Sequence, residues 1–156
     1  LTFSDEYQKL KNVKNRKKIK NKFYLLEEFI LEQVKNDNKV KMNKFDQNVL
    51  IHGHCHQKSQ DRMKGLTGLL SELKINNKTI ESSCCGMAGS FGYDNKNYEV
   101  SKKMANLSLI PAINNSDETD FIIANGTSCR HQIADLADKK GKHVSELLFK
   151  IFETVN

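Results

Sequence analysis

Four cysteines are the residues of this chain best suited to chemistry. Cys55, Cys84, Cys85 and Cys129 lie in a lysine-rich sequence with a single proline, and its first residues lack the layout of a secretory signal. We expect such cysteines to stay reduced, so metal binding or redox chemistry is favoured over a set of disulfides. Cys84 and Cys85 are neighbours, and their Cα atoms, about 3.8 Å apart, are closer than the roughly 4.4–6.8 Å of ordinary disulfides.

The spacing of the cysteines favours an iron–sulfur cluster over zinc. Zinc sites commonly use Cys-x-x-Cys pairs, and this sequence contains none. Adjacent cysteines are awkward as two corners around one small ion, whereas each can reach a different iron of a cluster. Two alternatives remain: a zinc-binding domain with a structural or partner-docking role, and a thiol-dependent enzyme in which Cys84 or Cys129 is the nucleophile.

Histidines are concentrated around the cysteines. We expect them to hydrogen-bond to the metal ligands or to carry protons, and the alternative is that one of them binds the metal directly. Because side chains alternate along an extended segment, Cys55 points away from its two neighbours, and at most one or two of these histidines share its side. The four that stand close to a cysteine in the sequence are His52, His54, His56 and His131.

Glycines accompany the same cysteines. A glycine lets the backbone approach a cluster or a substrate anion closely, and its N–H group can donate a hydrogen bond to it. The positions expected to do this are Gly86, Gly89, Gly92 and Gly126. We also expect Cys129 to begin a helix, whose positive dipole end favours the thiolate over the thiol.

The elements that must position these residues alternate between strands and helices. Apolar runs predict strands at 49–52 and 121–124, a weaker pattern predicts one at 79–82, and 143–144 adds a short fourth. Helical spacing of apolar residues predicts helices at 23–34, 59–73, 95–107, 129–138 and 145–154, with a break before Pro111. This order predicts an α/β fold with a parallel sheet of about four strands and helices on both faces. Each cysteine segment follows a strand, so we expect the Cys loops to meet at the carboxyl ends of the strands.

Length and composition indicate one domain. The 156 residues, 38% of them hydrophobic, suffice for one core, so we expect a single cysteine-rich domain spanning 1–156. The excess positive charge lies in residues 1–44, which hold 12 Lys/Arg against 6 Asp/Glu. We expect residues 8–22 to be an exposed basic connection, and because no aromatic residue is interleaved with its charges, we expect no nucleic-acid binding. No apolar run is long enough to span a bilayer, so we expect a cytoplasmic protein with no transmembrane segment.

Three segments resemble a known family. Residues 52–58 (HGHCHQK), 84–93 (CCGMAGSFGY) and 126–133 (GTSCRHQI) are similar to the cysteine-rich CCG domain. That domain occurs in the B subunit of heterodisulfide reductase, glycolate oxidase iron–sulfur subunits, the C subunit of anaerobic glycerol-3-phosphate dehydrogenase, and the C-terminal part of FAD-linked 2-hydroxyacid dehydrogenases of the D-lactate type. The last segment is most similar to the long FAD-linked oxidases. One departure is that Gly126 stands where the family has the first cysteine of a Cys-x-x-Cys pair.

The resemblance implies a role in electron transfer. It implies that the four cysteines hold an iron–sulfur cluster of the 4Fe–4S kind and that the chain is the C-terminal fragment of a larger one. It also implies two partners, a flavin-binding domain or subunit that carries FAD and a ferredoxin-like iron–sulfur domain, through which the protein could lie at the periphery of a membrane. Because the sequence lacks a glycine-rich dinucleotide fingerprint, we do not expect the chain to oxidise a 2-hydroxy acid by itself.

Overall fold

The computed structural model describes residues 6–10, 22–36 and 42–152. The basic connection expected at 8–22 lies mainly in residues 11–21, outside the described residues. A short helix, α1 (Glu6–Lys9), precedes that gap. Within the described ranges, no helix combines the length and the apolar character needed to cross a membrane.

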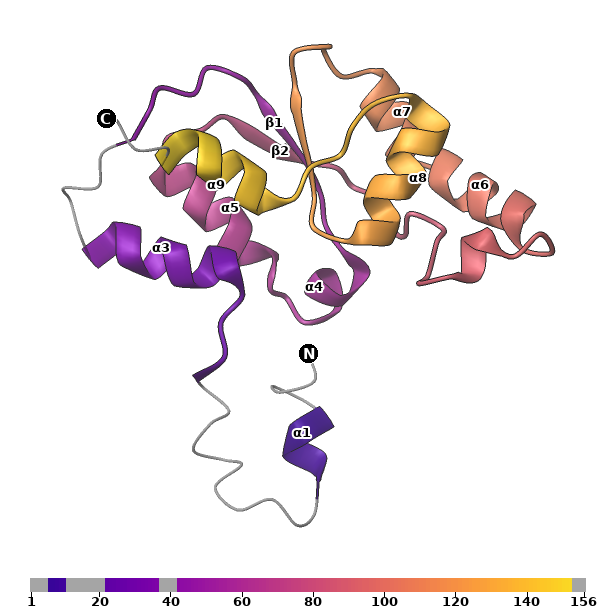
Figure 1. The fold of residues 1–156 in the computed structure, drawn as a ribbon, viewed down its shortest axis with the longest axis horizontal. Coiled ribbons are helices and arrows are strands. Elements are labelled where there is room, and N and C mark those ends of the chain that lie inside the picture. The colour runs from indigo at the N-terminus through magenta and orange to yellow at the C-terminus, as the bar shows by residue number, and fades with distance from the viewer. Residues whose placement is uncertain (1–5, 11–21, 37–41, 153–156) are drawn as a thin grey trace.

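Three parallel strands lie at the centre of the fold (Figure 1). They are β1 (Val49–His52), β2 (Asn77–Thr79) and β3 (Phe121–Ala124), in the order β2-β1-β3. Val49 lies opposite both Asn77 and Phe121, and His52 lies opposite Ala124. Every residue of β1 and β3 is buried, as is usual for parallel strands that are covered on both faces.

Helices surround the sheet and supply most of the remaining core. The longer ones follow or precede the strands in a regular alternation, as expected for a parallel sheet. In chain order they are α3 (Leu26–Asn36), α4 (Cys55–Ser59), α5 (Met63–Glu72), the 3-10 helix η2 (Phe91–Tyr93), α6 (Tyr98–Asn106), α7 (Leu109–Asn114), α8 (Thr127–Ala137) and α9 (Val144–Phe152).

The two faces of the sheet carry separate cores. On one face, Val49 and Ile51 pack with α5 and α9, and α3 packs against α5. On the other face, Leu50 and Ile122 pack with α7, α8 and Ala105 of α6. Side chains of a strand alternate between its faces, so the central strand β1 contributes to both cores. The predicted covering of both faces by helices is confirmed (Figure 1).

The sheet differs from the prediction in its strands. The second strand was expected at 79–82, but β2 ends at Thr79, and beyond it Ile80 adds one hydrogen bond from its N–H to the carbonyl of Ile51. The expected fourth strand at 143–144 is replaced by an isolated bridge between Lys142 and Ile123, because Val144 already begins α9. The sheet formed by the described residues therefore has three strands, one fewer than expected.

Two expectations between β1 and β2 also need correction. The helix predicted at 59–73 is α5, which begins only at Met63. The extended segment expected around Cys55 is instead the short helix α4, with a turn around Asp61 between the two helices. The predicted break before Pro111 is confirmed: α6 ends at Asn106, and Pro111 lies in the first turn of the separate helix α7, where a backbone N–H has no helical partner to lose.

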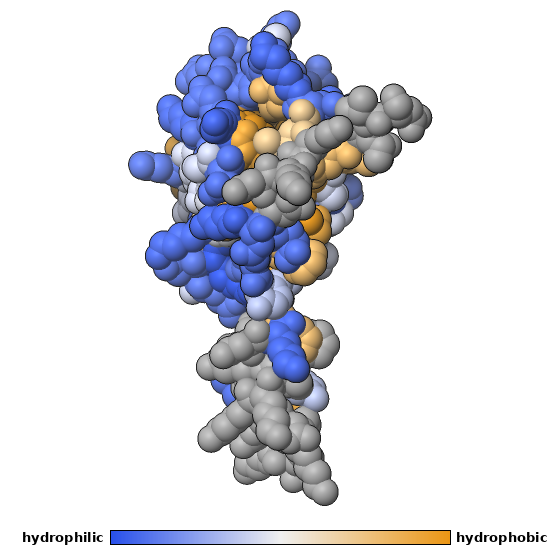
Figure 2. Space-filling model, turned by 90° about the vertical axis from the view of Figure 1, so that its left-hand side faces the viewer, coloured by the Kyte–Doolittle hydropathy of each residue, from blue (hydrophilic) through white to orange (hydrophobic). Residues whose placement is uncertain are grey.

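The side of the molecule that carries α3 and α9 is mainly hydrophilic, and apolar side chains gather in one part of it (Figure 2). Charged residues of these helices, such as Glu32 and Lys150, are exposed. Exposed apolar residues on the same helices include Phe29 and Phe149. The two buried cysteines belong to the core on the other face of the sheet.

Candidate metal centre

The carboxyl ends of β1 and β3 are the place where the topology favours a site. These strands are neighbours, but the helices that follow them cover opposite faces, α5 after β1 and α8 after β3. In an open parallel sheet such a reversal leaves a crevice beyond the strand ends, where ligands bind. His52 is the last residue of β1, and Cys129 lies in the first turn of α8.

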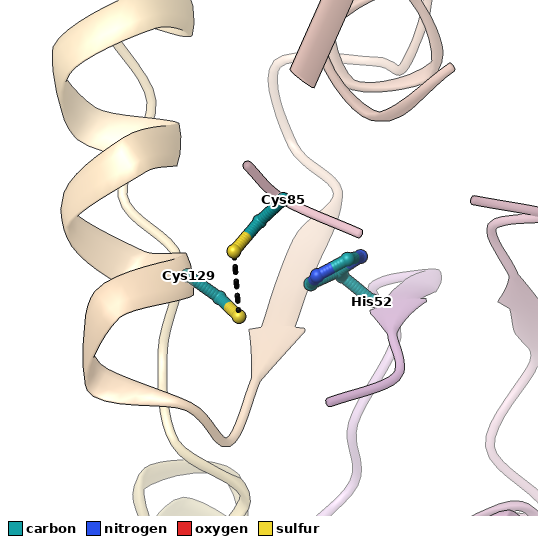
Figure 3. Close-up of side chains that lie close together, drawn as sticks. All are labelled: His52, Cys85 and Cys129. Atoms are coloured by element: carbon teal, nitrogen blue, oxygen red, sulfur yellow. Dashed lines mark hydrogen bonds between the residues drawn. The ribbon is translucent and has the colours of Figure 1, made fainter. Parts of the chain in front are cut away.

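Three buried side chains meet beyond these strand ends (Figure 3). His52, Cys85 and Cys129 have exposed fractions of 1%, 2% and 2%. The Sγ atoms of Cys129 and Cys85 are 3.3 Å apart and share a hydrogen bond that Cys129 donates. One nitrogen of His52 and the two sulfurs all lie within 4.8 Å of one another, so the three residues could hold one metal ion.

The strand pattern directs His52 into the site. Leu50 and His52 are two residues apart in β1, so both side chains point to the face where Cys85 and Cys129 lie. His52 Nδ1 is hydrogen-bonded to Ser82 Oγ at 2.9 Å. His52 Nε2 is buried and has no hydrogen-bond partner among the described residues. An unpaired buried nitrogen is costly unless a ligand occupies its lone pair, so this atom fits a metal site.

The other two cysteines, called the rim cysteines below, are less buried than this trio. Cys55 begins α4 and is half-buried, as is Cys84 in the loop that follows β2. The pKa of Cys55 is raised, first by burial and then by its hydrogen bond with Cys84. The backbone N–H of Gly86 donates to Cys84 Sγ at 3.3 Å. Both rim cysteines also interact electrostatically with Cys129, so the structure brings all four sulfurs to one region.

The buried sulfur pair shares one proton. The pKa of Cys85 is lowered to about 4, mainly by the hydrogen bond from Cys129 and with a smaller contribution from the nearby His52, while burial opposes both. The pKa of Cys129 is raised, first because its thiol donates to Cys85 and then because of burial. This direction is opposite to the one expected from the helix dipole at Cys129. One thiolate in the pair is nevertheless available for a metal, which requires deprotonated sulfur.

The remaining histidines of the sequence prediction lie outside this trio. His54 precedes α4, and its Nδ1 accepts a hydrogen bond from the N–H of His56 at 3.3 Å. Burial is the main reason that the pKa of His54 is lowered. His56 is exposed beside the His54 ring, with 5.0 Å between ring centroids. His131 is exposed and its Nδ1 is hydrogen-bonded to the Tyr93 hydroxyl at 2.5 Å.

The glycines of the prediction have different surroundings. A Cβ atom on Gly86 would lie 2.2 Å from the Ser101 carbonyl oxygen of α6, and one on Gly92 would lie 2.5 Å from Ser101 Oγ, so the close approach at these two is to protein. A Cβ on Gly89 would have no neighbour within 4 Å. At Gly126 an added Cβ would lie 3.0 Å from Cys129 Sγ and 2.3 Å from the His54 ring.

Two residues near the centre were missed by sequence reasoning. Ser82 Oγ is hydrogen-bonded to His52, but the sequence pattern placed Ser82 in a strand and indicated no role for it in the site. Lys58 donates from Nζ to the carbonyl oxygens of Ser82 and Ser83, the latter at 2.7 Å. Cys55 and Lys58 are three residues apart in α4 and so share a side of that helix. Lys58 thus connects α4 to the loop that carries Cys84. In the sequence, only its position within the 52–58 segment pointed to a role at the site.

The larger hollows of the surface lie elsewhere. A cavity of about 700 Å³ is lined by residues such as Lys78, Ser108 and Asp117 and by none of the four cysteines. A shallower one of about 320 Å³ touches the site only through His54 and Gly126. The candidate centre is therefore a buried cluster of ligand atoms, which suits a metal better than a large organic substrate.

Comparisons with known proteins connect the chain to dehydrogenases. A D-2-hydroxyglutarate dehydrogenase of Pseudomonas putida is 22% identical over 152 residues, which cover 96% of this chain and 14% of that protein. The C subunit of the anaerobic glycerol-3-phosphate dehydrogenase of Escherichia coli is 23% identical over 153 residues, or 92% of this chain and 36% of that protein. A D-2-hydroxyglutarate dehydrogenase of Haemophilus influenzae is 31% identical over 70 residues, or 45% of this chain and 7% of that protein.

The similarity is partial in both directions. No family model matches the chain, and no solved structure matches it. The chain spans 14% and 36% of the two relatives that cover most of it. It is thus similar to a part of larger dehydrogenase proteins, and this chain carries a cysteine and histidine cluster that could hold a metal ion.

Proposed function

We propose that the chain is an iron–sulfur electron-transfer domain of a larger flavin-linked oxidoreductase that acts on 2-hydroxy acids. The observation that carries the proposal is the meeting of sulfur atoms from distant segments, with 3.3 Å between Cys85 Sγ and Cys129 Sγ. Cys55 and Cys84, which interact electrostatically with that pair, complete the proposed ligand set. The similarity to dehydrogenase proteins supports a redox role.

The chemistry of the donor set supports the same proposal. Thiolate sulfur is the usual ligand of iron–sulfur clusters, which accept and release electrons when bound. The low pKa of Cys85 supplies a thiolate at neutral pH. The Gly86 N–H donates a hydrogen bond to Cys84 Sγ, and the burial of Cys85 and Cys129 keeps water away from the centre.

The partners belong to the proposal as well. The chain matches only part of each relative, so we place FAD on a separate flavin-binding domain or subunit and add a ferredoxin-like iron–sulfur domain between the two. The sequence has no glycine-rich dinucleotide fingerprint that would hold the flavin here. We place the protein in the cytoplasm, where its four cysteines remain reduced.

Zinc is the second candidate, because one observation favours it. His52, Cys85 and Cys129 offer one nitrogen and two sulfurs within 4.8 Å, and this set also suits a single zinc ion. The domain would then have a structural or partner-docking role. For the thiol-enzyme alternative, the burial of Cys129 disfavours that residue as the nucleophile, because a substrate reaches its sulfur poorly, and leaves the half-buried Cys84 as its candidate.

Metal analysis after anaerobic purification separates these candidates. An iron–sulfur domain gives a brown protein that contains iron and acid-labile sulfide, both lost in Cys85→Ser. His143→Ala is the matched control, because His143 lies outside the proposed ligand set. Its Nδ1 accepts a hydrogen bond from the N–H of Ser145, in the first turn of α9. A colourless protein with one zinc and no sulfide would replace the proposal by its zinc alternative.

Turnover measurements test the role in the larger protein. D-lactate, glycolate and related acids are assayed with an artificial acceptor, using the chain alone and the protein with its flavin-bearing region. We expect activity only when that region is present, because removal of hydride from a 2-hydroxy acid needs a flavin or nicotinamide cofactor. Turnover by the chain alone would mean that it is a catalytic unit and not a relay.

A further inference from the structure

We infer that His52 binds the metal directly through Nε2 and that Ser82 orients its ring, so that the centre has mixed nitrogen and sulfur ligands. This inference rests on the proposed presence of a metal at the candidate centre. It goes beyond a cluster held by the four cysteines, because it adds a ligand of another element and assigns Ser82 to the site.

The unpaired nitrogen carries the first step. His52 Nε2 is buried and has no hydrogen-bond partner among the described residues, and a nitrogen of the same ring lies within 4.8 Å of both Cys85 Sγ and Cys129 Sγ. Native proteins seldom leave such an atom unpaired, because removing a polar atom from water without giving it a hydrogen bond is unfavourable. A metal ion beside the two sulfurs would use the lone pair of this nitrogen, and Figure 3 shows the His52 ring beside the sulfur atoms of Cys85 and Cys129.

The hydrogen bond at the other ring nitrogen carries the second step. Metal-binding histidines usually donate their second N–H to an oxygen, which fixes the tautomer and the orientation of the ring. His52 Nδ1 has such a partner in Ser82 Oγ at 2.9 Å, and both residues are buried. If Nδ1 donates this bond, Nε2 carries the lone pair of a neutral imidazole and is ready to bind metal.

No other histidine near the cysteines combines these features. His54 Nδ1 is occupied by the N–H of His56, and the ring of His54 packs against Gly126. His131 is exposed and paired with Tyr93. His52 is also fixed by its backbone, since it lies opposite Ala124 in the central strand. A ligand on a rigid strand has a more precise position than one on a loop.

A nitrogen ligand has a chemical consequence for the centre. Neutral imidazole places less negative charge on iron than thiolate does, and clusters with histidine in place of cysteine have higher reduction potentials. The division of the cysteines fits this arrangement: His52 accompanies the buried pair, whereas the rim cysteines, Cys55 and Cys84, are half-buried. We therefore expect the redox centre to be asymmetric, with its nitrogen side buried.

Pulsed EPR of the reduced, anaerobically purified protein tests the inference. In protein labelled with 15N-histidine, we expect the 14N coupling of the paramagnetic centre to be replaced by 15N coupling. His52→Leu, which fills the space of the imidazole with an apolar side chain, should abolish the coupling, and His143→Ala should leave it unchanged. If the bound metal is zinc, X-ray absorption at the zinc edge gives the same information through the imidazole scattering.

Ser82→Ala supplies a test that keeps the nitrogen in place. We expect the coupling to persist while metal affinity falls about 10–100-fold, as for other residues that orient a ligand. Ser83→Ala is the control, because its exposed side chain is replaced while its carbonyl still accepts from Lys58. Protein that binds no metal under any condition would overturn the proposed function itself. Metal-loaded protein without nitrogen coupling, or with coupling that survives His52→Leu, would overturn this inference alone.

Discussion

Replacement of Gly86 by alanine tests how the loop that carries Cys84 and Cys85 is held. Gly86 follows Cys85 directly and has a φ of +90°, a conformation that favours glycine. An added Cβ would lie 2.2 Å from the carbonyl oxygen of Ser101 and 3.0 Å from its carbonyl carbon. Ser101 cannot yield easily, because it is buried in α6 and its oxygens accept hydrogen bonds from Gln132.

The size of the effect follows from two costs and one gain. A side chain at positive φ costs about 1–2 kcal/mol, and forcing a methyl group into packed protein costs about 1–3 kcal/mol more. Alanine also restricts the unfolded chain, which returns about 0.4–1 kcal/mol. We therefore expect Gly86→Ala to lower the free energy of unfolding by about 1–5 kcal/mol, a large share of the roughly 5–15 kcal/mol of a typical domain.

Gly89→Ala is the matched control for this change. Gly89 lies in the same loop and has a φ of +71°, but a Cβ there would meet nothing within 4 Å. It should lose only the backbone cost, about 1 kcal/mol after the gain in the unfolded state. Urea unfolding of both variants, followed by circular dichroism under reducing conditions, gives the difference. Equal destabilisation of the two would refute the claim that the contact with Ser101 holds the loop.

Three further predictions concern the surroundings of the site. Lys58→Met should weaken metal binding about 10-fold in a chelator competition, because the loop loses its ties to α4, whereas the exposed Lys64→Met should not; equal affinities would exclude a positioning role. Cys84→Ser should remove metal with little change in unfolding free energy, since the cores lie elsewhere, and unfolding of this variant would mean that the loop is structural. Burial raises the pKa of Glu27, so the stability that its protonated form contributes is present below pH 4.5 and is lost as the pH rises through the folded pKa. Glu27→Gln should remove this loss from unfolding curves measured across that range, and an unchanged pH dependence would contradict the assignment.

The strands could be predicted from the sequence only where they are buried. Val49–His52 and Phe121–Ala124 are apolar runs covered on both faces, and their bounds match the prediction. The remaining strand, β2 (Asn77–Thr79), is a polar edge strand. Backbone hydrogen bonds pair it with β1, and such pairing leaves no apolar pattern in the sequence. The prediction therefore placed this strand at residues 79–82, which include the apolar Ile80. Pairing of this kind depends on contacts distant in sequence, which periodicity does not report.

The site could be predicted as a region but not in its internal order. Because each cysteine follows a strand, their gathering at one sheet edge follows from topology alone, and the sulfur contact between Cys85 and Cys129 agrees with it. The sequence could not show that His52, and not His54, joins the buried sulfur pair. Its distinction from His54 depends on which ring nitrogen is unpaired after folding, and that depends on Ser82, thirty residues away in the sequence.

The placement of His52 at the end of a fully buried strand has a consequence for insertions and deletions. Strand side chains alternate, so one residue added within β1 would turn His52 toward the core of α5 and α9 and would exchange the positions of Leu50 and Ile51. A length change in the exposed turn at 94–96, which precedes α6, would leave that alternation intact. Deep insertion scanning should therefore find β1 intolerant of a single added codon, even one that encodes another apolar residue.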